Sequence, residues 1–77
     1  MYNYRVSLNS VEKVKDFVAV TSRLPMEMEL ASGRYVVDAK SIMGIFSLDL
    51  SKPIDLNIHA NEEMDAILEV LKPYIIE

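Results

Sequence analysis

The chain of 77 residues and 8.8 kDa has room for one small domain, residues 1–77, and none for a second core or a large buried active site. Its 8 Lys and Arg residues against 12 Asp and Glu residues give a net charge of −4, which disfavours binding to nucleic acid or to an anionic membrane surface. The lack of cysteine excludes disulfides and thiolate metal sites, and the 51% hydrophobic content excludes a disordered chain. We therefore expect a cytoplasmic domain that is not an enzyme and carries no cofactor or metal.

A strand over residues 2–8 is predicted by the strict alternation of apolar and polar side chains. A helix should follow, because Asn9 and Glu12 have the spacing of a capping box. Pro25 disfavours helical geometry at the residue before it, so this helix should end near Arg23. The apolar positions of the predicted helix, spaced at i, i+3, i+4 and i+7, are Val11, Val14, Phe17, Val18, Thr21 and Leu24.

From Met26 onwards apolar and polar side chains alternate again, and Met26, Met28 and Leu30 lie on one face. Ser32 and Gly33 signal a turn, and residues 34–37 resume extended structure, so residues 26–37 predict a β-hairpin. The apolar segment 42–50 follows, and its composition alone does not separate a short helix from a buried strand.

Residues 54–60 alternate again and predict a fourth strand with one polar face that carries His59. Asn61 should cap a last helix, with Glu62, Glu63 and Asp65 in its first turn, where the helix dipole favours acidic side chains. The apolar stripe of this helix is Met64, Ile67, Leu68 and Leu71, and Pro73 should end it. Strands with one apolar face need all their helices on that side, so the fold class is α+β.

The string from Ala39 to Leu48, Ala-Lys-Ser-Ile-Met-Gly-Ile-Phe-Ser-Leu, resembles the HPr family, the histidine-containing phosphocarriers of the sugar phosphotransferase system (PTS). The element order and length are also similar to that family over nearly the whole chain. The resemblance implies an open-faced β-sandwich of order β-α-β-β-α-β-α, in which residues 42–50 begin with a short helix and Ser41 lies at its start.

The resemblance also implies a site at the start of the first helix, where the family has a histidine that carries phosphate and an arginine close by. Extending the match without gaps places Ser10 at the histidine position and Glu12 at the arginine position. The only histidine, His59, lies in the predicted fourth strand, where a solvated strand residue is the ordinary interpretation. A serine phosphate ester lacks the transfer potential of phosphohistidine, and a carboxylate at position 12 would repel phosphate.

Ser41 matches the serine that a regulatory kinase phosphorylates in some members of the family, although serine is also an ordinary helix cap. Ile42, Met43 and Phe46 match an exposed apolar docking patch in HPr-like proteins, whereas Ile45 and Leu48 match inward positions. In so small a chain, the alternative is that all five side chains belong to the core.

Three hypotheses about function follow. The first is a protein-binding or regulatory HPr-like module without histidine phosphotransfer, whose partner is a phosphotransferase component or a transcriptional regulator. The second is an atypical phosphoacceptor modified on Ser41 or Ser10. The third is a structural role, either as a monomer or as a weak homodimer formed through an edge strand.

Overall fold

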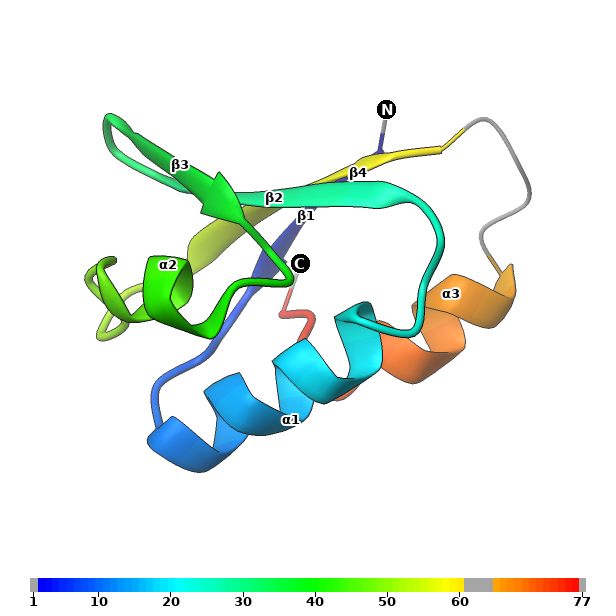
Figure 1. The fold of residues 1–77 in the computed structure, drawn as a ribbon, viewed down its shortest axis with the longest axis horizontal. Helices are drawn as coiled ribbons and strands as arrows, with labels where there is room; N and C mark the ends of the chain where they lie inside the picture. Colours follow the sequence, from blue (N-terminus) through cyan, green and yellow to red (C-terminus); the bar gives the residue numbers. More distant parts are fainter. Residues whose placement is uncertain (1, 61–64, 77) are drawn as a thin grey trace.

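The computed structural model describes residues 2–60 and 65–76, which form a four-stranded antiparallel sheet with three helices on one face (Figure 1). The other face of the sheet is open, so the α+β open-faced β-sandwich is confirmed. The elements in chain order are β1 (Tyr2–Val6), α1 (Val11–Thr21), β2 (Glu27–Ser32), β3 (Tyr35–Asp38), α2 (Ile42–Phe46), β4 (Ile54–His59) and α3 (Asp65–Leu71). Residues 61–64, which include the predicted cap Asn61 and the stripe residue Met64, lie outside the described part of the chain.

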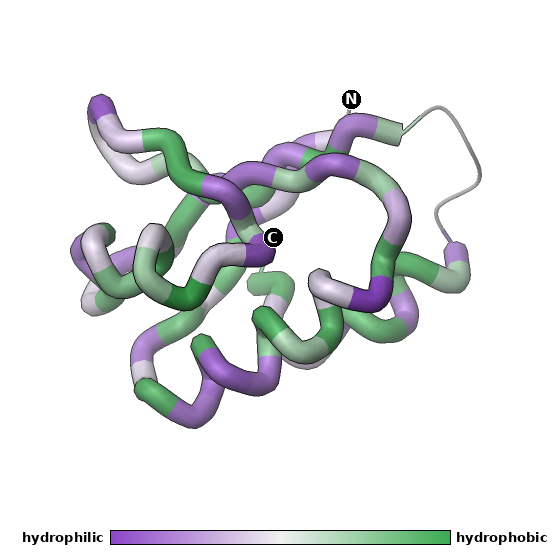
Figure 2. Tube along the Cα trace, viewed as in Figure 1, coloured by the Kyte–Doolittle hydropathy of each residue, from purple (hydrophilic) through white to green (hydrophobic). Residues whose placement is uncertain are grey.

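The strands lie in the order β1-β4-β2-β3, so β4 is inserted between two strands that precede it in the chain. Leu30 of β2 pairs with Val37 of β3 on one side and with Leu56 of β4 on the other. Because paired residues share a face of the sheet, these three side chains all point towards the helices. Successive side chains of a strand point to opposite faces of the sheet, and hydrophobic and hydrophilic residues alternate along the strands accordingly (Figure 2).

The core lies between the sheet and the helices. Its fully buried members include Phe17 of α1, Ile45 of α2 and Leu71 of α3, one from each helix. The sheet contributes, among others, Val6, Met28, Leu30, Ile54, Leu56 and Ile58, as the alternation predicts. Val11 is an exception to the predicted helical stripe: it is exposed, because the first turn of α1 extends past the core.

The hairpin between β2 and β3 turns over two residues, Gly33 and Arg34, with Ser32 paired to Tyr35. Gly33 has a φ of +60°, and every non-glycine residue in the described chain has a negative φ. A positive φ at the first central position only is the pattern of a type II′ turn, which matches the twist of paired strands. The predicted turn at Ser32-Gly33 is therefore confirmed.

The segment after α3 is more ordered than a tail. The helix ends at Leu71 before Pro73, and the chain then runs beside β1. The amide of Ser7 donates to the carbonyl of Tyr74 at 2.9 Å, and the amide of Ile76 donates to the carbonyl of Arg5 at 2.8 Å. These bonds cover part of the outer edge of β1. The Tyr74 ring meets Phe17 edge-on, with ring centroids 5.3 Å apart.

Candidate functional site: a hollow between the start of α1 and α2

The start of α1 is defined by Ser10. Its backbone is extended (φ −148°, ψ 156°), and its Oγ accepts a hydrogen bond from the amide of Lys13 at 3.1 Å. This is the geometry of an N-cap residue, so the prediction that Asn9 caps the helix is wrong by one residue. Glu12 is exposed in the first turn, where the helix dipole favours a carboxylate.

Ser10 is exposed and lines a surface hollow of about 380 Å³. The hollow lies between the start of α1 and the end of α2 with the loop after it. Its lining residues are Asn9, Ser10, Val11, Phe46, Leu50 and Ser51, and neither a histidine nor an arginine is among them. The structure thus brings together Ser10 and Phe46, which the sequence singled out for different reasons.

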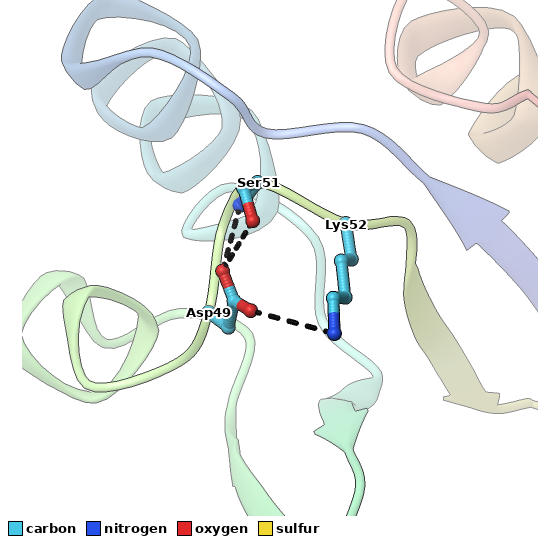
Figure 3. A network of polar contacts seen from close by, with 3 residues as sticks. All are labelled: Asp49, Ser51 and Lys52. Atoms are coloured by element: carbon cyan, nitrogen blue, oxygen red, sulfur yellow. Dashed lines mark hydrogen bonds and ion pairs between the residues drawn. The ribbon is translucent and has the colours of Figure 1, made fainter.

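The loop after α2 forms one wall of this hollow and is held by Asp49 (Figure 3). The Asp49 carboxylate accepts hydrogen bonds from the hydroxyl of Ser51 at 2.6 Å and from its amide at 3.1 Å, and Lys52 Nζ lies 3.9 Å away. The Ser51 hydroxyl, the Ser51 amide and then the Lys52 charge lower the pKa of Asp49 below its ordinary value. Asp49 therefore stays ionised at neutral pH and adds negative charge beside the hollow.

Helix α2 is short and turns one side to the core. Ile45 is fully buried and Leu48 nearly so, whereas Met43 is 80% exposed, Phe46 is 40% exposed and Ile42 is also exposed. These three residues form what we call the α2 patch. Of the two possibilities that the sequence left open, the structure supports the exposed patch for these three side chains and the core for Ile45 and Leu48.

Ser41 caps α2 and is half-buried. Its Oγ accepts a hydrogen bond from the amide of Gly44 at 3.1 Å. Gly44 packs closely on β3, since a Cβ atom there would lie 3.1 Å from Cβ of Val37. The ammonium of Lys40 donates to the carbonyl of Leu24 at 2.7 Å. Lys40 is thus committed to the loop after α1, although it adjoins Ser41 in the sequence.

His59 lies far from this hollow. It is the last residue of β4 and pairs with Glu27, whereas Ile54 at the other end of β4 pairs with Val6, which leads to α1. Its ring is exposed on the open face, with Nε2 3.5 Å from a carboxylate oxygen of Glu29. In the described part of the chain, no three His, Asp or Glu side chains are grouped to hold a metal ion.

Sequence reasoning missed the contribution of the loop after α2 to the hollow. The sequence shows Leu50 only as part of the apolar segment 42–50, and no motif or spacing indicates that Ser51 lines the hollow. Val11, which the helical spacing places in the apolar stripe, is exposed. Contacts between α1 and the loop after α2 depend on the tertiary fold and have no periodic pattern in the sequence.

The order of these elements and the single helical layer on the sheet form an open-faced β-sandwich of the HPr type. A family model described as the PTS HPr component phosphorylation site matches residues 12–76 of the chain. The chain therefore belongs to the HPr family. The match begins two residues after Ser10.

A crystal structure of HPr-C-His from Thermoanaerobacter tengcongensis has a similar fold, with a TM-score of 0.76. The two sequences are 24% identical, and the similarity covers 94% of this chain and 89% of the other. No significant match to a curated protein was found. Among the described helices, none is long and apolar enough to cross a membrane.

Proposed function

We propose that this HPr-family protein works by binding another protein and does not carry phosphate on a histidine. The observation that supports this most strongly is the separation of His59 from the start of α1, where Ser10 lies in the hollow. Helix N-termini favour anions because their amides are free and the dipole is positive there. A phosphohistidine at that position would need an imidazole, and the hollow has a serine hydroxyl instead.

The charges near the hollow oppose phosphate transfer as well. Glu12 is exposed in the first turn of α1, and Asp49 is ionised beside Ser51. Both carboxylates would repel a phosphate dianion on Ser10. The cation of Lys52 is shared with Asp49, so it offsets only part of this negative charge. In our proposal Ser10 stands at the position of the family's histidine and Glu12 at that of its arginine.

The α2 patch is the surface through which we propose that the partner binds. Ile45 fixes α2 to the core, so Ile42, Met43 and Phe46 are presented on a rigid element. Methionine adapts its shape to several partners, and an aromatic side chain supplies apolar area. Phe46 also lines the hollow, so a partner on the patch would cover Ser10. The partner class is a phosphotransferase component or a transcriptional regulator, and the domain itself is not an enzyme.

Binding to the host's general phosphotransferase enzyme tests this proposal. We expect Met43→Asp to weaken binding, measured by calorimetry, by about tenfold or more, because it places a charge at the centre of an apolar contact. Val70→Asp is a matched control, since Val70 is 45% exposed on α3. Equal affinities for both variants and the unaltered protein would refute docking through the α2 patch. If the unaltered protein does not bind the general phosphotransferase enzyme, the affinities of the same variants are compared for a transcriptional regulator of carbon metabolism.

The second candidate function is a phosphoacceptor, and the exposure of Ser10 favours it at that residue over Ser41. Ser10 is exposed at the start of an 11-residue helix, whereas Ser41 is half-buried. Incubation with an HPr-type kinase and ATP, or with the general phosphotransferase enzyme and phosphoenolpyruvate, would test both sites. Under this hypothesis the protein gains the mass of one phosphoryl group, and Ser10→Ala or Ser41→Ala removes the gain. No gain in either reaction would exclude the hypothesis.

A further inference from the structure

The two edges of the sheet differ in how they are covered. The outer edge of β1 is partly covered by residues 74–76. No strand of residues 2–60 and 65–76 pairs with the outer edge of β3. Tyr35 and Val36 on this edge are 68% and 58% exposed. Natural edge strands are protected by short length, charged side chains, proline or a bulge; the four-residue strand Tyr35–Asp38 has no proline or bulge, and its one charged side chain is Asp38.

The backbone of β3 is oriented for a further strand. In a two-residue hairpin the flanking pair, Ser32 and Tyr35, exchanges hydrogen bonds, and bonded pairs then alternate along the ladder. The amide of Ala39 donates to the carbonyl of Met28 at 3.1 Å, as this alternation requires. Val36 therefore directs its amide and carbonyl away from β2, towards the uncovered edge.

On the open face of the sheet, two carboxylates lie next to each other beside the outer edge of β3. A row of polar side chains crosses the sheet: Asn3 donates to Asn57, Asn57 donates to Glu29 at 3.5 Å, and Glu29 lies opposite Asp38. Two carboxylates that face each other across a strand pair destabilise it, so a cation beside Asp38 would be favourable. The Asp38 carboxylate accepts a hydrogen bond from the amide of Lys40 at 2.8 Å, and the Asp38 carbonyl accepts one from the amide of Ser41 at 3.0 Å, so neither bond brings a cationic side chain to this carboxylate.

We propose that β3 binds β3 of a second copy of this chain, antiparallel, about a two-fold axis at Val36. This register places Arg34 opposite Asp38 of the second copy, and Asp38 opposite Arg34 of the second copy. The partner's guanidinium thus extends the polar row beside Glu29 and Asp38. On the helix side, Tyr35 lies opposite Val37 of the second copy, an aromatic and β-branched pair that stabilises sheets. One strand supplies both halves of a self-complementary interface, as two-fold symmetry requires.

Sedimentation over a series of concentrations tests this dimer. We expect the weight-average mass to rise from 8.8 kDa towards twice that value. Val36→Lys should abolish the rise, whereas Val70→Lys, on an exposed helix position, should leave it unchanged. Arg34→Asp alone and Asp38→Arg alone should each weaken association by about tenfold, since each places like charges opposite one another twice in the interface. The double reversal Arg34→Asp/Asp38→Arg should restore it.

Amide hydrogen exchange supplies a second measurement on the unaltered protein. The Val36 amide should exchange more slowly as concentration rises, whereas the Val37 amide, already bonded to β2, should not change. A monomer at all concentrations up to about 1 mM would overturn the proposal. So would a dimer that tolerates Val36→Lys, or one that the double reversal does not restore. All these variants leave Met43 in place, so the dimer and the partner-binding proposal fail independently.

Discussion

The hydroxyl of Thr21, at the end of α1, donates a 3.0 Å hydrogen bond to the carbonyl of Ala39, just before α2. Both residues are fully buried, and Thr21 is the buried polar residue of the described core. The bond joins segments 18 residues apart in the sequence. It fixes the approach to α2 relative to α1, and the candidate site lies between these two helices.

Thr21→Val should lower the free energy of unfolding by about 1–3 kcal/mol, because it keeps the shape of the side chain and leaves the Ala39 carbonyl buried without this partner. Urea denaturation measures the loss. Thr21→Ser is the matched control, since it keeps the hydroxyl and removes a methyl group. Stability of Thr21→Val equal to that of the unaltered protein would show that this bond does not hold α1 to the α2 segment.

Gly33→Ala should destabilise the protein by about 1–2 kcal/mol through backbone strain at positive φ. A Cβ atom at this position would meet no other atom within 4 Å, so steric crowding contributes nothing to the loss. Thermal unfolding followed by circular dichroism measures the effect. Gly33→Asn should cost less, because asparagine tolerates positive φ better than alanine does. Equal stability of the alanine variant would contradict the assignment of a type II′ turn.

The sequence was sufficient for the elements whose side chains repeat regularly. Alternation at Ile54, Leu56 and Ile58 located β4 and its buried face, and Gly33 located the hairpin. Capping at Ser10 in place of Asn9 was not predictable, because both residue types accept a hydrogen bond and the backbone conformation decides between them. Pairing of residues 74–76 with β1 was also missed, since it depends on where α3 ends in space.

The candidate site was predicted in separate parts. The resemblance pointed to Ser10 and to the α2 patch, but only the folded chain shows that Phe46 and Ser10 share one hollow. The uncovered edge of β3 likewise depends on the strand order, because β4 crosses between β1 and β2. Adjacency of this kind has no local signature in a sequence.

Ser51→Ala should raise the pKa of Asp49 towards its ordinary value of 3.8, because it removes the hydroxyl that contributes most to the lowered pKa. Since the folded pKa is lowered, the stabilisation by ionised Asp49 is present above pH 3.8 and is lost as the pH falls through the folded pKa. Carboxyl NMR titration measures both proteins. Lys52→Ala should produce a smaller rise, and a larger rise would contradict the assigned order of causes.

Transfer of phosphate from phosphoenolpyruvate, through the general phosphotransferase enzyme, is the most direct test of the central claim. The reaction is followed with labelled phosphate, and an authentic HPr serves as the positive control. We predict that no label is found on His59 and that none passes from this protein to a sugar-specific acceptor. Label on His59 that is lost in His59→Gln, or label that reaches the acceptor, would contradict the claim that the protein works without histidine phosphotransfer.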